Sequence, residues 1–446
     1  MMSLRTVASV AIATLTHSFF ALALSIVLAR LLGPAGRGIY AMLTLTATLA
    51  AAVGTLGFES GNVFALSRSD RDGRGVLAAS LTLACVCGTA LFAAVNLLAS
   101  QLGSSLLPQV PLRLLAIATL AIPFLILASL LNGALSGLGR VSLAAWLSAG
   151  GVLLSLMLAV GAALVSSDIL TALAIVFLLS NGFLAALQLG VAIRIVGSPM
   201  VDPRPALRSG IRYSLTNHAA NLVNLLHLRG DVFLVNLFLT PFEVGLYALA
   251  LAVCEWVWLV PRAAAAVLFP SVAGSDSSSA VASTTRTSRF VFWTAGVVAV
   301  AMAILAGWLI PFLFGEAFAA TAHPVRLLLV GIWIGSIAGS LSAFLSGRGR
   351  PEFPLATSVV SFLVNLTLNL LLIPRFGIAG AAVTSSLTYS MNTAVNLIFF
   401  RRMTGKSPIE LFRLRKDDVD AARRAGRRLF RPSSSETVLV RKDAGS

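Results

Sequence analysis

Long apolar segments separated by short polar connections occupy the chain up to about residue 400. An α-helix needs about 20 predominantly apolar residues to cross the hydrocarbon core of a bilayer. Segments that meet this requirement are 7–29, 39–66, 76–99, 112–135, 142–165, 169–194, 213–239, 244–269, 290–313, 326–346, 355–373 and 379–400. The connections between them are rich in Gly, Pro and Ser, which favour turns. The pattern therefore predicts an all-α membrane protein with twelve transmembrane helices.

The composition supports this prediction and argues against a set of soluble domains. Of the 446 residues, 57% are hydrophobic and 11% are charged, whereas a soluble domain carries about 25% charged residues. The three cysteines, Cys85, Cys87 and Cys254, lie inside apolar segments. We therefore expect neither a disulfide framework nor a metal cluster.

The distribution of basic residues predicts the orientation in the membrane. The chain has 33 Lys and Arg against 17 Asp and Glu. With the N-terminus in the cytoplasm, 26 of the 33 basic residues fall on the cytoplasmic side, 5 on the other side and 2 within helices. Because loops rich in Lys and Arg stay in the cytoplasm, both termini are expected there. The expected location is a cytoplasmic membrane.

An internal repeat divides the predicted helices into two sets. Residues 32–42 recur as residues 239–249 in the pattern Pro-x3-Gly-x-Tyr-Ala, and residues 135–140 recur as 345–350. An even number of helices separates the copies, so both halves are expected to insert in the same orientation. This predicts two parallel six-helix bundles, with boundaries at 1–200, an inter-bundle linker 201–212, a second bundle 213–400 and a basic tail 401–446.

Several ionisable residues lie inside predicted membrane helices, where each costs about 2.5–3.5 kcal/mol on insertion scales. Glu59, Arg229, Asp231 and Glu255 are the main examples. The helices around residues 229 and 255 form a predicted hairpin that turns near residues 241–242, so Arg229 and Glu255 are expected at the same depth. Two interpretations remain open: an ion cluster that locks the hairpin, or a site in which Arg229 binds an anion and the carboxylates change protonation.

Two predicted helices also carry rows of polar residues. One row consists of Asn217, Asn221 and Asn224 together with Asp231, and the other of Ser358, Ser361, Asn365 and Asn369. In a membrane such rows either bond neighbouring helices together or line a hydrophilic cavity. Both roles remain open from the sequence. The second role predicts substrate binding by Arg229, Asn217, Asn221, Asn224, Asn365 and Asn369, with ion coupling by Asp231, Glu255 and Glu59.

No enzyme signature is present, so the prediction is a protein that is not an enzyme, with no catalytic residues, cofactor or metal. The sequence has neither a His-Glu-x-x-His motif nor a phosphate-binding loop with Lys. Transport by such a protein would have to use an ion gradient or the membrane potential.

Three segments resemble a known family. Residues 29–68, 229–251 and 347–403 are similar to parts of bacterial polysaccharide-transport flippases, the O-antigen-type lipid-linked oligosaccharide flippases. This family belongs to the multidrug/oligosaccharidyl-lipid/polysaccharide exporter superfamily. The most specific shared motifs are residues 32–40 and the run from Asn365 through Pro374 to Ala381.

The resemblance implies a function and a set of partners. It implies two six-helix bundles that alternate between inward- and outward-facing states and carry a polyprenyl-diphosphate-linked oligosaccharide to the periplasmic face. Arg229 would contribute to a positively charged lumen, and Asp231 matches an Asp of the family's seventh helix. The expected partners are the lipid-linked glycan and membrane lipids, with a glycan polymerase or glycosyltransferases as further candidates. A monomer that binds no nucleic acid is expected.

Three alternatives compete with this interpretation. A multidrug extruder of the same superfamily would use Glu59, Asp231 and Glu255 around a cationic drug. A major-facilitator-type transporter is suggested by the loop at residues 70–74, which reads Asp-Arg-Asp-Gly-Arg. A scaffold that anchors glycosyltransferases through its basic tail is the third alternative. The tail itself is expected either to lie on anionic headgroups as a helix or to serve as a solvated topology anchor.

Overall fold

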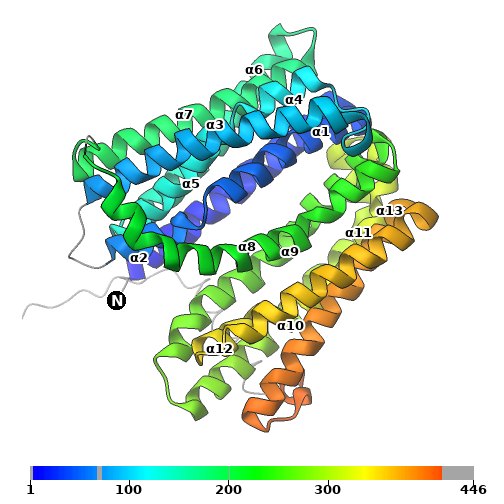
Figure 1. The fold of residues 1–446 in the computed structure, drawn as a ribbon. Helices are drawn as coiled ribbons and strands as arrows, with labels where there is room; N and C mark the ends of the chain where they lie inside the picture. The colour runs from blue at the N-terminus through cyan, green and yellow to red at the C-terminus, as the bar shows by residue number, and fades with distance from the viewer. Residues whose placement is uncertain (1–3, 68–72, 200, 414–446) are drawn as a thin grey trace, which may run out of the picture.

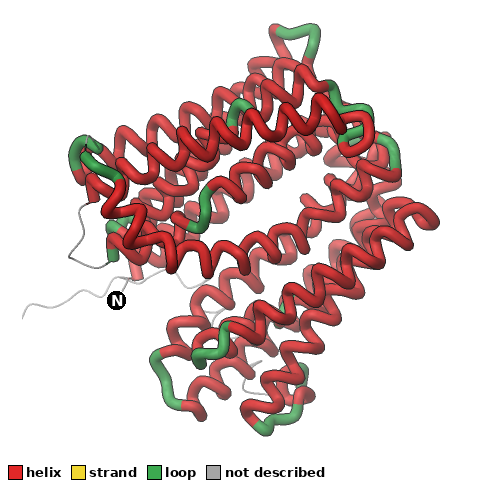
Figure 2. The backbone as a smooth tube through the Cα atoms, viewed as in Figure 1, coloured by secondary structure: helices red, strands yellow, loops and turns green. Residues whose placement is uncertain are grey.

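The computed structural model describes residues 4–67, 73–199 and 201–413, and all regular elements in these ranges are helices (Figures 1 and 2). The helices are α1 Leu4–Gly54, α2 Phe58–Leu66, α3 Gly73–Leu106, α4 Leu112–Thr119, α5 Ile122–Gly137, α6 Val141–Val165, α7 Ile169–Val196, α8 Arg204–Phe238, α9 Pro241–Ala273, α10 Ser277–Phe314, α11 Ala322–Gly335, α12 Ala338–Gly347 and α13 Glu352–Thr404, with the 3₁₀ helices η1 Glu316–Thr321 and η2 Pro408–Leu411. The predicted all-α fold is confirmed. Most of the tail and the loop residues 70–72 lie outside the described residues.

Nine helical stretches in the described ranges are long and apolar enough to cross a membrane. Two of them extend over two predicted segments each: α1 covers 7–29 and the first part of 39–66, whose last part forms α2, and α13 covers 355–373 and 379–400. The chain bends within them at Gly33 (φ 62°) and Gly377 (φ 58°), which adopt backbone angles that glycine tolerates best. The α8 helix is not among the nine, because its Arg, His and Asn residues lower its hydropathy.

The second sequence repeat corresponds to the same turn in both halves. At the end of α5, the amide of Arg140 donates to the carbonyl of Leu135 at 2.9 Å, and Gly139 has φ 76°. At the end of α12, the amide of Arg350 donates to the carbonyl of Leu345 at 2.9 Å, and Gly349 also has φ 76°. The repeated sequence motif therefore forms the same helix C-terminus in both halves, with a glycine of positive φ just after the helix.

The helices form two groups that converge at one end and diverge at the other (Figure 1). The first group contains α1 to α7 and the second contains α9 to α13, while α8 contacts α2 of the first group and α13 of the second. One apolar cluster is shared by both groups, from Met42 and Leu115 to Tyr247 and Leu328. Two further clusters each belong to a single group. Shared packing thus joins the groups where they converge.

The first sequence repeat forms the contact between the groups. Gly38 of α1 and Gly245 of α9 lie against each other's helix: a Cβ atom on Gly38 would overlap the carbonyl oxygen of Pro241, and one on Gly245 would overlap that of Pro34. Glycine at both positions lets the two backbones approach closely, as at many membrane helix crossings. Arg30 adds hydrogen bonds to the carbonyls of residues 312 and 313 at the end of α10 (2.6 and 2.8 Å).

We predict that Gly38→Ala destabilises the protein, because the added methyl group must push the α1 and α9 backbones apart. Overpacking of this kind costs about 1–3 kcal/mol. Thermal unfolding of the purified protein in detergent should show a fall of several degrees in Tm. Gly190→Ala is the matched control: nothing lies within 4 Å of its added Cβ, so its Tm should stay unchanged or rise. Equal Tm values for wild type and Gly38→Ala would contradict the close crossing.

Candidate functional site

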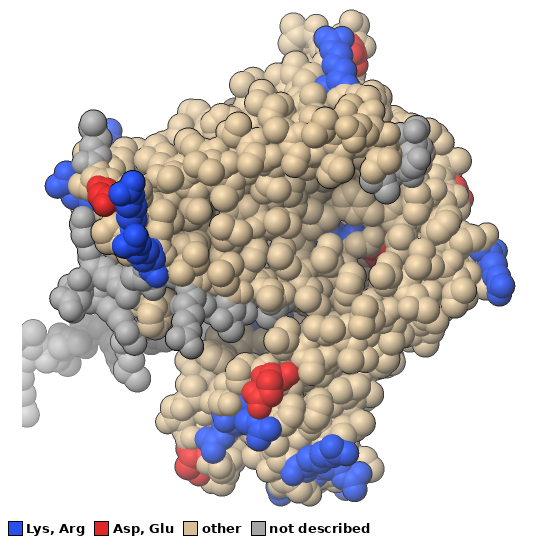
Figure 3. All heavy atoms as spheres, in the orientation of Figure 1, with Lys and Arg blue, Asp and Glu red and all other residues tan. Residues whose placement is uncertain are grey.

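A hollow lies between the two helix groups, and basic and acidic atoms are visible inside it in Figure 3. Arg229 of α8 and Glu255 of α9 form an ion pair. Their side chains are 33% and 43% exposed, so the pair is accessible from outside the packed helices. The pairing expected from the hairpin is therefore present.

The turn between α8 and α9 sets the depth of this pair. The α9 helix begins with Thr240 as its N-cap residue and Pro241 at its first position. The carboxylate of Glu243 accepts hydrogen bonds from the Thr240 amide (3.0 Å) and hydroxyl (3.2 Å), which completes a capping box. Because this turn is fixed, positions about equally distant from it on the two helices, such as Arg229 and Glu255, lie side by side.

Arg229 keeps its positive charge in nearly any environment, whereas a carboxylate can be neutralised by a proton. The pair therefore provides a permanent cation whose partner is the carboxylate of Glu255. An anion that enters the hollow can compete with Glu255 for the guanidinium group, which offers planar, two-point hydrogen bonding to phosphate or carboxylate. This arrangement suits reversible binding of an anionic group.

Asp231 belongs to a different, buried cluster and is not the third member of the ion pair. It is 1% exposed, and its Oδ2 accepts hydrogen bonds from the Tyr247 hydroxyl (2.5 Å) and the Ser385 hydroxyl (3.0 Å). Its Oδ1 is buried and makes no hydrogen bond within the described part of the chain. Three helices, α8, α9 and α13, thus converge on one carboxylate.

The polar row of α13 lies beside this cluster. The two arms of α13 run antiparallel, since the rings of Phe353 and Phe399 stack at 4.4 Å and the Asn365 amide donates to Thr388 at 3.2 Å. The Asn369 amide donates to the side-chain oxygen of Asn365 at 2.9 Å. Continued by one helical turn, this register pairs position 369 with position 384, which precedes Ser385 in the chain.

Buried oxygens gather in this region of the second group. Besides Asp231 Oδ1, the side-chain oxygens of Asn369 and Thr384 are buried without a hydrogen-bond partner among the described residues. Unpaired buried oxygens are costly and are the atoms that hard cations prefer as ligands. The described residues contain no group of three or more His, Cys, Asp or Glu side chains that could hold a metal ion. The buried oxygens near Asp231 therefore comprise one carboxylate and neutral side-chain oxygens.

The other candidate residues differ in their burial. Asn365 and Asn369, in the polar row beside the Asp231 cluster, are 2% and 0% exposed and bond within α13, which favours a role in joining its two arms over direct lining of a cavity. Asn221 and Asn224 are exposed near the middle of α8, and the side chain of Asn217 lies outside the described part. The carboxylate of Glu59 is exposed and accepts a hydrogen bond from Ser129 of α5 at 2.8 Å.

Sequence reasoning missed Tyr247, Thr384, Ser385 and Thr388 as members of the buried cluster. Tyr247 was visible as the tyrosine of the Pro-x3-Gly-x-Tyr-Ala repeat, whose counterpart in the first half is Tyr40. The hydroxyl residues carry no comparable signal, since Ser and Thr occur in many membrane helices for reasons of packing alone.

A family model described as "Polysaccharide biosynthesis protein" matches residues 27–323, which is more than half of the chain. The chain belongs to this polysaccharide biosynthesis protein family. The membership confirms the polysaccharide-export resemblance that the sequence motifs indicate. With its many apolar helices, this family member is a multi-pass membrane protein.

A probable low-salt glycan biosynthesis flippase of Haloferax volcanii is similar to this polysaccharide biosynthesis protein. The two are 26% identical over 242 residues, which are 53% of this chain and 50% of the relative. The chain therefore spans half the length of that relative.

Two solved structures share the fold. The lipid II flippase MurJ in an inward closed conformation superposes with a TM-score of 0.74, at 13% identity, over 90% of this chain and 88% of the other. An inward-facing multidrug resistance transporter of the MATE family gives a TM-score of 0.71, at 15% identity, over 87% and 94%. At these identities the likeness shows a shared helical fold.

We predict that Arg229 and Glu255 are energetically coupled in this polysaccharide biosynthesis protein. Arg229→Gln or Glu255→Gln alone leaves one unpaired charge in the hollow, while the double variant leaves none. Partly exposed pairs contribute about 1 kcal/mol or less, so the double variant should be less destabilised than the sum of the single variants by about that amount. Thermal unfolding in detergent measures the difference. Strict additivity would show that the pair is not formed in solution.

Proposed function

We propose that this protein is a flippase that moves a polyprenyl-diphosphate-linked oligosaccharide from the cytoplasmic to the periplasmic face of the bacterial inner membrane for polysaccharide export. The observation that carries the proposal is the partly exposed Arg229–Glu255 ion pair, in a chain that belongs to a polysaccharide biosynthesis family. A diphosphate and its sugars must cross about 30 Å of hydrocarbon, which requires a cationic and hydrogen-bonding path.

In this proposal Arg229 contacts the diphosphate and Glu255 holds the guanidinium group when no substrate is bound. The exposed Asn221 and Asn224 lie two turns or so earlier on α8 and would offer hydrogen bonds to sugars. The prenyl chain stays in the lipid, because its transfer into a polar hollow would lose hydrophobic stabilisation. A glycan polymerase or glycosyltransferases would supply or consume the substrate.

Alternating access between two parallel six-helix bundles is the proposed mechanism. The groups meet at the Gly38–Gly245 crossing and diverge toward the end that carries the N-terminus (Figure 1). If basic loops hold the N-terminus in the cytoplasm, the open end faces the cytoplasm, which is where the substrate is loaded. The likeness to an inward-facing transporter of the MATE family, at a TM-score of 0.71, supports this assignment.

We propose that a monovalent cation bound at the Asp231 cluster determines the direction of transport. Asp231, Asn369 and Thr384 would provide the oxygens, since each has a buried oxygen without a hydrogen bond in the described structure. A cation there would satisfy these atoms and neutralise the carboxylate. Glu255 would act with it by changing protonation, and Glu59 remains a predicted ion-coupling residue.

The test of substrate binding uses a bacterial host that lacks this gene and accumulates the lipid-linked glycan at the cytoplasmic face. Wild-type protein should restore surface polysaccharide. Arg229→Gln should abolish export at equal protein level, whereas Arg229→Lys should retain part of it, because Lys keeps the charge but loses two-point hydrogen bonding. Surface glycan and lipid-linked intermediates are measured by mass spectrometry. Normal export by Arg229→Gln would refute the role of Arg229.

The same host strain distinguishes the flippase from the second candidate function, a multidrug extruder. The fold likeness to a MATE-family transporter favours this second candidate. An extruder predicts unchanged glycan and increased sensitivity to cationic drugs when the gene is lost. In that outcome the accessible carboxylate of Glu255, rather than Arg229, would be the binding group.

We predict that Asp231→Asn removes the cation dependence of the protein. Na⁺, compared with choline, should raise the Tm of the purified wild type, and this rise should disappear in Asp231→Asn while export falls at least about tenfold. The control is Glu316→Gln, an exposed carboxylate on η1, which should keep the Na⁺ effect. A full Na⁺ effect in Asp231→Asn would exclude the cluster as the cation site.

A further inference from the structure

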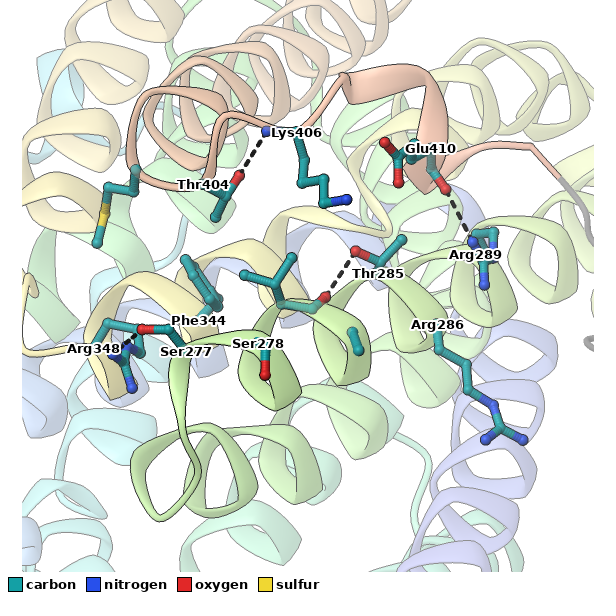
Figure 4. A pocket seen from close by; sticks show the side chains of 13 residues that line it. Ser277, Ser278, Thr285, Arg286, Arg289, Phe344, Arg348, Thr404, Lys406 and Glu410 are labelled. Carbon is teal, nitrogen blue, oxygen red and sulfur yellow. Dashed lines mark hydrogen bonds between the residues drawn. The ribbon is translucent and has the colours of Figure 1, made fainter.

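A basic pocket lies far from the hollow, at the end of the second helix group where the tail begins (Figure 4). Its volume is about 900 Å³, and its walls come from the start of α10, the end of α12, the end of α13 and the segment that contains η2. This size is within the range of pockets that bind small molecules, about 300–1,000 Å³. The pocket plays no part in the proposed path of the glycan.

Positive charge dominates the pocket wall. Arg286, Arg289, Arg348 and Lys406 line it, together with a single carboxylate, Glu410. Clustered like charges repel one another, and the repulsion is strong where neighbouring protein displaces water. A bound anion would relieve this repulsion.

Two of the cations are held in place by the protein. The Arg348 guanidinium group donates to the carbonyl of Ser275 (3.1 Å) and the hydroxyl of Ser277 (2.7 Å). The Arg289 side chain, which is 6% exposed, donates to the carbonyl of Glu410 at 3.2 Å. The two Arg348 bonds are to neutral groups, so Arg348 brings a fixed positive charge to the wall.

The other two cations are available to a ligand. Arg286 and Lys406 are exposed, and their side chains make no hydrogen bond or ion pair within the described residues. In Figure 4 the Lys406 side chain extends from the C-terminal segment toward α10. The N-terminus of α10 is already capped by Asp276, which accepts from the amides of Ser278 and Ser279. Side chains, not the helix terminus, would therefore hold the anion.

The surroundings of the pocket are apolar and are expected to face lipid. Phe290, Trp293 and Ile409 are 54%, 39% and 69% exposed. The Trp293 indole donates to the carbonyl of Phe412 at 2.9 Å, and the Phe412 ring packs on Phe292 with ring centres 4.9 Å apart. Tryptophan at the boundary between apolar and charged regions is typical of the membrane interface. The pocket thus lies at headgroup depth.

We propose that this pocket binds the phosphate of an anionic membrane phospholipid, with the acyl chains along the exposed apolar face of α10. Basic pockets between transmembrane helices at the cytoplasmic surface are suited to such headgroups. Arg286 and Lys406 bind the phosphate oxygens, while Arg348 supplies fixed charge. The site is independent of the flippase proposal.

The test compares phosphatidylglycerol with phosphatidylcholine of the same acyl chains, added to the purified full-length protein in detergent. Native mass spectrometry measures bound lipid, and thermal unfolding measures stabilisation. Wild type should bind phosphatidylglycerol in preference to phosphatidylcholine. The double variant R286Q/K406Q should lose this preference, with affinity for phosphatidylglycerol at least about tenfold weaker.

The matched control is R401Q/R402Q, which removes two exposed cations at the same end of α13 that do not line the pocket. This control should keep the preference of the wild type. Without lipid both double variants should unfold at the wild-type temperature, because all four side chains are exposed. Undiminished phosphatidylglycerol binding by R286Q/K406Q, or equal loss in the control, would overturn the pocket as the site. Equal stabilisation by inorganic phosphate would overturn a lipid as its ligand.

Discussion

The close crossing of α1 and α9 determines how the two helix groups are placed. Gly38 and Gly245 lie where a single added carbon atom would overlap the facing backbone, so the helices approach as closely as backbones can. Lipid offers no hydrophobic driving force between helices, and such packing of small residues is what holds membrane helices together. Because the groups are joined at this end and α8 alone connects them along its length, a hollow remains between them.

The polar chemistry of the protein lies in the second half of the chain. At the repeat spacing, Arg229, Asp231 and Glu255 correspond to Leu22, Leu24 and Thr48, which are uncharged. The repeat therefore includes the helices but not these three polar residues. This asymmetry is consistent with a division of labour in which the first half provides a mainly apolar wall and the second half provides charge and hydrogen bonds.

The sequence predicted some features of the site well because they depend on helix length alone. The Arg229–Glu255 pair followed from distance to a turn marked by Pro241, and the all-helical fold followed from apolar segments. The sequence did not predict that 7–29 and the first part of 39–66 form one bent helix, since Gly33 fits a loop or a kink equally well. Nor did it separate Asp231 from Arg229, two positions apart on α8. Residues two positions apart on a helix differ by about 200° in direction and so lie on nearly opposite sides, and packing against α13 decides which of them is buried.

The buried cluster and the helix crossing are connected through α9. Tyr247, which bonds to Asp231, follows Gly245 by two residues on the same rigid helix. A cation that binds at Asp231 would compete with the Tyr247 hydroxyl for the carboxylate and so change the force on α9 close to the crossing. An effector shifts a conformational equilibrium only when it binds the two states with different free energy. If a cation binds at Asp231 as proposed, the Tyr247–Asp231 hydrogen bond would connect that cation directly to α9.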